Sequence, residues 1–214
     1  TKNFKVENEY LSLAGTLINC SGGITPWNTW ITCEETVAKK NKFLLKDHGY
    51  NFEVPATAKP HLAQAVALKA MGRFNHEAIA VDPKTGIVYQ TEDRHDGLLY
   101  RFIPNVKGQL ARGGKLQALV VEDAAALDTR NWEEQRVDVG AQLAVSWLDL
   151  DDVESPKENL RQRGFKKGAA RFARGEGMWY SRSSIYFACT NGGKKKEGQV
   201  WRLTGDMLEL FAEP

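Results

Sequence analysis

The stretch Gly97-Leu98-Leu99-Tyr100-Arg101-Phe102 is the most informative part of the sequence, because its pattern recurs. It reads glycine, two residues, an aromatic, a charged and an apolar residue, and residues 49–54 and 198–203 repeat it. Residues 145–149 form a similar segment without the glycine. The aromatic residues of the four copies lie 48, 47 and 54 residues apart. Near-constant spacing of this kind predicts a repeat architecture.

An apolar strand that ends in polar or acidic residues precedes three of the copies, at residues 30–35, 87–93 and 185–191. Residues 94–97 and 192–198 have the composition of hairpin connections. An antiparallel repeat of this size predicts an all-β fold, a β-propeller with about four recognisable blades. Those blades are either most of a small propeller or part of a larger one.

The rest of the sequence fits into this single domain, residues 1–214, because no linker divides it. We expect short helical insertions at residues 62–71 and 155–174, and a helix or a loop at residues 123–134. The glycine- and proline-rich residues 19–27 predict a loop.

The bulk properties describe a globular protein whose main partner is neither nucleic acid nor a membrane. Hydrophobic residues make up 42% of the chain, charged residues 26%, and the formal net charge is only +2. No apolar run reaches the length of a membrane span, and the first ten residues do not resemble a signal peptide. Three cysteines cannot all pair within one chain. A disulfide between Cys20 and Cys33 is conceivable, and Cys189 lies in an apolar strand typical of a core.

Acidic residues and one thiol lie at predicted strand ends, which meet at the mouth of a propeller's channel. The candidate metal ligands are Cys33, Glu34, Glu77, Glu92, Asp93 and Glu176. Crowded carboxylates require protons or cations, and they suit calcium or magnesium, whereas a thiolate favours iron or zinc. Arg174 is the candidate for binding a phosphate. The alternatives are structural: Glu77 as a turn cap, Asp93 as a turn residue, Arg174 with Glu176 as a surface ion pair, and Cys33 as a core residue.

The chain resembles the PhoX-type alkaline phosphatases in several short blocks that occur in the family's order. These blocks are Asn19-Cys20-Ser21-Gly22-Gly23-Ile24-Thr25-Pro26-Trp27-Asn28-Thr29-Trp30, Thr32-Cys33-Glu34-Glu35, Met71-Gly72-Arg73-Phe74-Asn75-His76-Glu77, Tyr89-Gln90-Thr91-Glu92-Asp93, Tyr100-Arg101-Phe102, Arg174-Gly175-Glu176-Gly177 and Gly198-Gln199-Val200-Trp201-Arg202.

The resemblance implies an exported or periplasmic β-propeller phosphomonoesterase that holds calcium and iron and acts through a metal-bridging oxygen. By motif, it assigns metal binding to Cys33, Glu77 and Glu176, less directly to Glu34, Glu92 and Asp93, and phosphate binding to Arg174. The chain is shorter than the usual family member and lacks the family's twin-arginine leader. We therefore expect an incomplete set of ligands, and self-association if blades are missing.

The sequence leaves three functions open. The first is a metal-dependent phosphomonoesterase acting on a small-molecule phosphate ester. The second is a calcium-dependent lactonase or esterase, since propellers also support that chemistry. The third is a truncated propeller that serves as a scaffold without catalysis.

Overall fold

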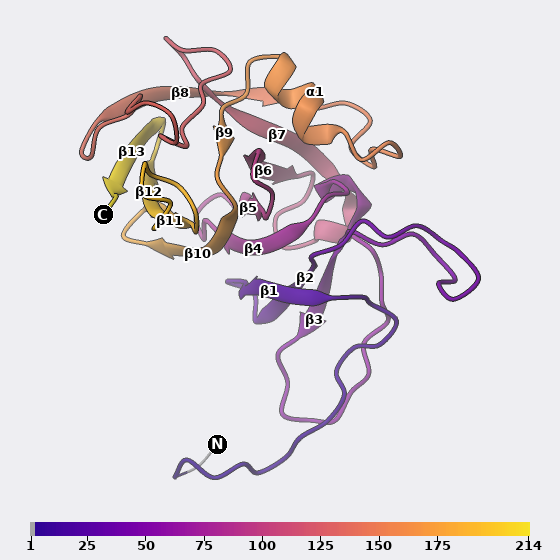
Figure 1. Ribbon diagram of the computed structural model, residues 1–214. Helices are drawn as coiled ribbons and strands as arrows, with labels where there is room; N and C mark the ends of the chain where they lie inside the picture. Colours follow the sequence, from indigo (N-terminus) through magenta and orange to yellow (C-terminus); the bar gives the residue numbers. More distant parts are fainter. Residues whose placement is uncertain (1–2) are drawn as a thin grey trace.

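The computed structural model describes residues 3–214 and is built almost entirely from antiparallel strands (Figure 1). A three-stranded sheet has the order β1-β2-β3, with β1 at Asn19–Ile24, β2 at Thr29–Glu34 and β3 at Asn51–Pro55. A larger sheet has the order β10-β11-β12-β13-β8-β7-β6-β5-β4. Its strands are β4 (His76–Val81), β5 (Val88–Glu92), β6 (Gly97–Pro104), β7 (Gly114–Val121), β8 (Gln142–Asp149), β10 (Gly175–Ser181), β11 (Ser184–Cys189), β12 (Gln199–Thr204) and β13 (Met207–Ala212). The all-β prediction is confirmed.

The repeated aromatic residues mark three equivalent units. Phe52, Tyr100 and Trp201 lie on β3, β6 and β12, the third strand of each unit, and at most 1% of each is exposed. The units are β1–β3, β4–β7 and β10–β13. The fourth aromatic residue of the repeat, Trp147, lies on β8, which pairs with both β7 and β13 and so joins the second unit to the third.

The first strands of the three units, β1, β4 and β10, are the inner strands of the fold. β4 packs against both β1 and β10, as Figure 1 shows. Two buried apolar clusters support this arrangement. One contains Ile31, Met71 and Phe102, and the other contains Phe172, Phe187 and Trp201.

The glycine-rich segment at residues 19–27 contains strand β1, so the prediction of a loop there was wrong. Its glycines allow close packing of strands. A Cβ atom on Gly23 would lie 2.3 Å from the carbonyl oxygen of Ile79 on β4, and one on Gly22 would lie 2.0 Å from that of Ile31 on β2. The glycines therefore bring β1 against its two neighbours, which a chain with side chains at both positions cannot do.

Helical structure is less extensive than we expected. In residues 62–71 the structure has only a short 3-10 turn, η1 (Lys69–Met71), and a second, η2 (Leu110–Arg112), follows β6. Within residues 155–174 the structure has α1 (Leu160–Lys166) and the short strand β9 (Arg171–Phe172), which pairs with β6. Residues 123–134 form a loop.

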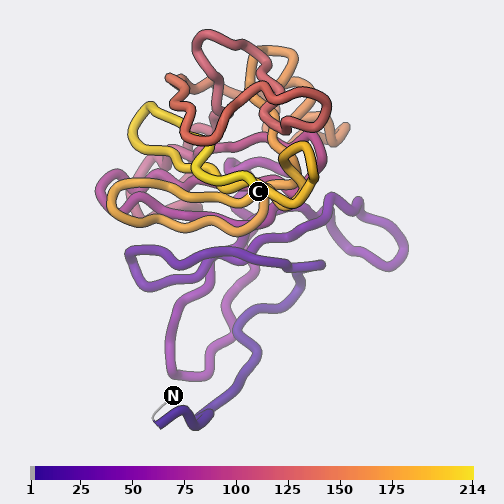
Figure 2. Tube along the Cα trace, turned by 60° about the vertical axis from the view of Figure 1, so that its left-hand side comes forward, coloured from indigo at the N-terminus to yellow at the C-terminus, as the bar shows by residue number. Residues whose placement is uncertain are grey.

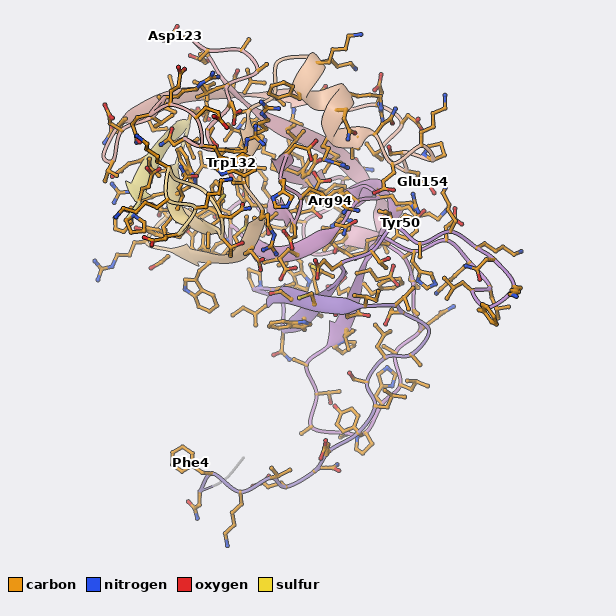
Figure 3. All side chains as sticks on the ribbon, in the orientation of Figure 1. Phe4, Tyr50, Arg94, Asp123, Trp132 and Glu154 are labelled. Atoms are coloured by element: carbon orange, nitrogen blue, oxygen red, sulfur yellow. The ribbon has the colours of Figure 1, made fainter. Side chains whose placement is uncertain are left out.

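The three-stranded sheet is tied to the larger body by side chains as well as by β4. The hydroxyl of Tyr50 donates to Glu154 Oε2 at 3.2 Å, and Lys69 Nζ donates to the same oxygen at 2.8 Å (Figure 3). On the other side of the sheet, residues 3–18 and 55–68 extend away from the body together (Figure 2). A bridge between Leu13 and Ala63 joins these two segments. Among the described residues, no helix has the length and apolar character needed to cross a membrane.

Candidate metal centre

Each inner strand carries a β-bulge at the same position, directly after its first residue. Two residues of the inner strand lie opposite one of its neighbour: between Asn19 and Gly22 on β1, between His76 and Ile79 on β4 and between Gly175 and Met178 on β10. A bulge changes the direction in which the bulged strand presents its side chains, and bulges are frequent beside active sites. The second residues of the three strands, all at a bulge, are Cys20, Glu77 and Glu176.

The second strand of each unit ends at this same end of the inner strands. Glu35, Asp93 and Thr190 are the residues that directly follow β2, β5 and β11. They lie 15, 16 and 14 residues after Cys20, Glu77 and Glu176. Each unit therefore supplies one residue from its inner strand and one from the end of its second strand.

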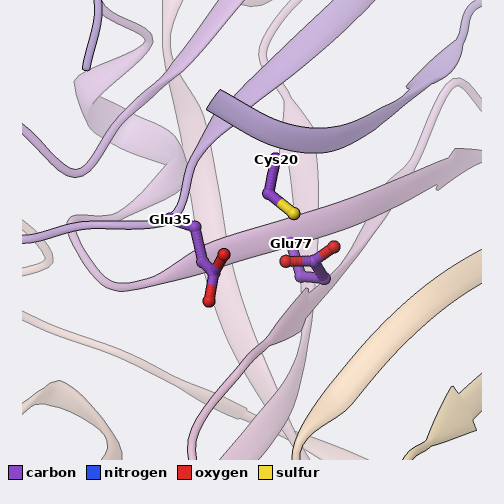
Figure 4. A group of neighbouring side chains, drawn as sticks. All are labelled: Cys20, Glu35 and Glu77. Carbon is purple, nitrogen blue, oxygen red and sulfur yellow. The ribbon is translucent and has the colours of Figure 1, made fainter. Parts of the chain in front are cut away.

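Cys20, Glu35 and Glu77 converge on one point (Figure 4). One ligand atom of each lies within 4.8 Å of the other two, and the thiol forms hydrogen bonds with both carboxyl groups. Asp93 extends the group, because its carboxylate lies close enough to Glu35 to help raise the pKa of that carboxyl group. We call Cys20, Glu35, Glu77, Asp93 and Glu176 the acidic cluster.

Every resolved pKa shift in the acidic cluster is upward. Desolvation raises the pKa of Glu77 to about 7, and repulsion from Glu176, Glu35 and Asp93 adds to it. Desolvation, helped by neighbouring carboxylates, also raises the pKa values of Glu35 and Glu176. The pKa of the Cys20 thiol rises to about 12, first through desolvation and then through its hydrogen bond to Glu77. The cluster thus resists becoming fully ionised unless positive charge is supplied.

Arg174 supplies part of that positive charge from the strand-to-strand connection before β10. Its Nε and Nη2 atoms donate to the two oxygens of Asp93 at 2.8 and 2.7 Å, and Nη2 donates to Glu176 Oε1 at 2.9 Å. Hydrogen bonding to Asp93, with the charge of Asp93 and Glu176, raises its pKa. Its backbone has a φ of 53°, held by hydrogen bonds to Arg94 and Thr190. One guanidinium therefore connects carboxylates of the second and third units.

The donor set fits a metal ion. Glu77 is only 3% exposed, yet its Oε2 atom is buried without a hydrogen-bond partner. Such an atom is costly unless a ligand satisfies it. Carboxylate oxygens are the ligands that calcium prefers, while a thiolate beside them suits iron or zinc. Glu77, Glu35 and Cys20 would hold such an ion directly, with Asp93 and Glu176 close enough to contribute charge.

The structure brings together Glu77, Asp93, Glu176 and Arg174 of the residues we expected at the site. It does not bring Cys33, Glu34 or Glu92 there. Cys33 is fully buried within the apolar cluster that contains Ile31 and lies outside the group of ligand atoms, although desolvation, with the nearby Glu77 and Cys20 adding to it, raises its pKa well above the usual range. All three described cysteines are free, so Cys33 is not bonded to Cys20.

Glu34 and Glu92 are the last residues of β2 and β5, and each is buried in a network of its own. Glu34 accepts four hydrogen bonds, from the backbone amides of Leu17, Gly49 and Tyr50 and from His48 Nδ1. These bonds occupy the lone pairs that a metal would need. Glu92 accepts from the Tyr100 hydroxyl at 2.7 Å and from the Leu98 amide, and desolvation raises its pKa to about 7. Successive side chains of a strand point to opposite faces, so the next residues, Glu35 and Asp93, reach the cluster instead.

Sequence reasoning missed Cys20 and Glu35. A usable signal was present, because Asn19-Cys20, His76-Glu77 and Gly175-Glu176 stand at similar distances before the polar ends of the following strands. The interpretation of residues 19–27 as a loop concealed that equivalence.

Comparison with known proteins identifies a family and a similar fold. The family model for alkaline phosphatase PhoX matches residues 1–211. A solved structure, Pseudomonas fluorescens PhoX in complex with vanadate, a transition state analogue, is similar with a TM-score of 0.60 and 21% identity. The match covers 87% of this chain and 44% of that chain, so this chain spans less than half of its length. No curated protein matches significantly.

The structural similarity confirms the β-propeller fold that the repeat predicted. Because the family model covers nearly the entire chain, the protein belongs to the alkaline phosphatase PhoX family.

Proposed function

We propose that the chain carries a metal-dependent phosphomonoesterase site at the acidic cluster, with calcium and iron as the metals. One observation carries the proposal: thiol, carboxylates and an arginine from three units meet at one end of the inner strands. Membership of the PhoX family supports the reaction type. The substrate class is a small-molecule phosphate ester, and the family relationship makes an exported protein the working hypothesis.

Arg174 is the residue placed to bind the phosphate. A guanidinium has five N–H groups, and Asp93 and Glu176 accept three hydrogen bonds from two of its nitrogens. The two remaining N–H groups, both on Nη1, can donate hydrogen bonds to phosphate oxygens. Because Asp93 holds one edge of the guanidinium through Nε and Nη2, little rotational entropy is lost when the phosphate binds.

Glu77, Glu35 and Cys20 would hold the metals, Cys20 and Glu77 from the strands β1 and β4 and Glu35 from the position directly after β2. When bound, the metals would supply Lewis-acid polarisation of the phosphate ester and a lower pKa for the attacking water. In the reaction, the water oxygen forms a bond to phosphorus, the ester P–O bond breaks, and the departing alkoxide takes up a proton. The donors on Arg174 stabilise the negative charge on the phosphoryl oxygens, and calcium would add to this when bound.

The test is release of nitrophenol from nitrophenyl phosphate by the chain, stripped of metal and then reloaded with calcium, with iron or with both. The proposal predicts turnover only after reloading, and loss of turnover in the Glu77→Gln variant. A parallel panel of lactones separates a phosphatase from a calcium-dependent lactonase. Absence of turnover on the phosphate ester with every metal combination would contradict the proposal.

A further inference from the structure

The molecule has a groove of about 450 Å³ that runs along the three inner strands. We call it the inner-strand groove. It is bounded by β1, β4 and β10, and its mostly apolar walls include Ile24, Trp30, Ile79, Val81, Met178 and Trp179. None of the described residues that line it is charged. Its volume lies within the range of small-molecule sites.

The groove begins where the acidic cluster ends. Ser21 and Gly177, which line it, directly follow Cys20 and Glu176 in the chain. Ile79 lies two residues after Glu77 on β4. A strand advances about 3.3 Å per residue, so the groove starts within about 7 Å of the cluster along each strand. The same three strands therefore carry first the charged residues and then the apolar walls.

The groove also leaves large apolar side chains exposed. Trp179 is 61% exposed, Ile24 is 58% and Trp30 is 42%. An exposed apolar patch that adjoins polar groups is typical of a binding site. A Cβ atom on Gly177 would meet no heavy atom within 4 Å, so the structure leaves space for a side chain at this position of the groove.

We propose that the inner-strand groove binds the organic group of the phosphate ester and favours an apolar, aromatic group over a small or charged one. The inference rests on the proposed function, in which the phosphate is bound at the acidic cluster and Arg174. A ring attached to that phosphate through one carbon would enter the end of the groove that adjoins the cluster, beside Ile79 and Gly177. A sugar or a charged group would lose its hydration there without finding a charged partner.

Binding of two non-hydrolysable phosphonates tests this without relying on catalysis. Calorimetric titration of the metal-loaded chain with benzylphosphonate and with methylphosphonate compares an aromatic with a methyl group on the same anion. We expect benzylphosphonate to bind about tenfold to a hundredfold more tightly, because burial of a ring in an apolar site has effects of this size.

Two variants test whether the inner-strand groove causes the preference for benzylphosphonate. Trp179→Ala removes an apolar wall, and Gly177→Val fills the open space with a side chain that a strand accepts readily. We expect each to reduce the ratio of the two dissociation constants to about threefold or less, while the affinity for methylphosphonate and the metal content stay unchanged. Phe43→Ala is the matched control, because Phe43 is an exposed aromatic residue, 81% accessible, in the loop between β2 and β3. It should retain the wild-type ratio.

Equal affinities for the two phosphonates, or a preference that both groove variants retain, would overturn the inference. Hydrolysis of benzyl phosphate and methyl phosphate is measured on the same preparations. Loss of hydrolysis with the binding preference intact would contradict the proposed function alone, whereas hydrolysis without a binding preference would contradict the groove alone.

Discussion

Glu34 and Glu35 are neighbours in the chain, yet their carboxyl groups belong to different parts of the structure. Glu34 is fully buried and accepts four hydrogen bonds, whereas Glu35 lies within 4.8 Å of Cys20 and Glu77 in the acidic cluster. The end of β2 separates them, so one side chain points into the protein and the other towards the inner strands.

This relationship predicts opposite effects of two adjacent substitutions. Glu34→Gln places an amide N–H group among donors, and we expect it to lower the free energy of unfolding by about 3 kcal/mol. Metal bound per folded chain should not change. Glu35→Gln should weaken metal binding at least about tenfold and leave the stability of the metal-free chain within about 0.5 kcal/mol. Urea denaturation and calorimetric metal titration measure the two effects, and loss of metal from a fully stable Glu34→Gln variant would contradict the assignment.

Cys33→Ser tests the structural role of the buried thiol. The new hydroxyl would lie in an apolar cluster, so we expect a loss of about 1–3 kcal/mol in the free energy of unfolding. Metal content per folded chain should remain that of the wild type. Thermal or urea unfolding with elemental analysis checks both quantities. A stable Cys33→Ser variant that binds no metal would refute this role.

The repeat was visible in the sequence because core residues obey simple periodicity. Phe52 and Tyr100 had to be buried in strands, and their spacing of 48 residues gave the size of a unit. The fourth copy, which contains Trp147, has the same local pattern. Its place between two units depends on the pairing of β8 with β13, strands that lie far apart in the sequence.

The site was only partly predictable, because it depends on the direction in which each side chain points more than on which residue types are present. Glu77, Asp93 and Glu176 were found because acids at strand ends are conspicuous. Cys20 and Glu35 were missed because the bulge that aims Cys20 and the alternation that separates Glu35 from Glu34 depend on register. A register is fixed by the pairing of whole strands, and the glycines of β1 concealed that it was a strand.

Arg174→Lys should weaken phosphate binding without unfolding the protein. A lysine cannot contact both oxygens of Asp93 and a phosphate at once, so we expect the dissociation constant for phosphate or vanadate to rise at least about tenfold. Arg202→Lys is the matched control, because Arg202 forms a similar pair with Glu209 on the strands β12 and β13. Unchanged phosphate affinity in Arg174→Lys, or an equal loss in both variants, would argue against the role of Arg174.

The metal-free chain should become less stable as the pH rises from about 4.5 to about 7. In the unfolded chain Glu77 has an ordinary pKa of 4.5, while in the folded chain its pKa is about 7. The folded chain therefore binds more protons in this interval, and the free energy of unfolding falls with pH, by up to about 3 kcal/mol for this group. The raised pKa values of Glu35 and Glu176 act in the same direction.

Thermal unfolding with a chelator at pH 5 and pH 7 measures this slope. Glu77→Gln should reduce the dependence of stability on pH, because the amide does not titrate. Saturating calcium should abolish this dependence, because the cation takes the place of the proton on Glu77. A metal-free chain that gains stability over the same interval would show that the carboxyl groups are not crowded as described.

The central claim is that the bulge on β1 presents Cys20, rather than Cys33, to a metal shared with Glu35 and Glu77. X-ray absorption at the iron edge of the iron-loaded chain tests it most directly, because sulfur and oxygen ligands scatter differently. We predict one sulfur ligand in the wild type and in Cys33→Ser, and none in Cys20→Ser. A sulfur ligand that persists in Cys20→Ser and disappears in Cys33→Ser would contradict the account.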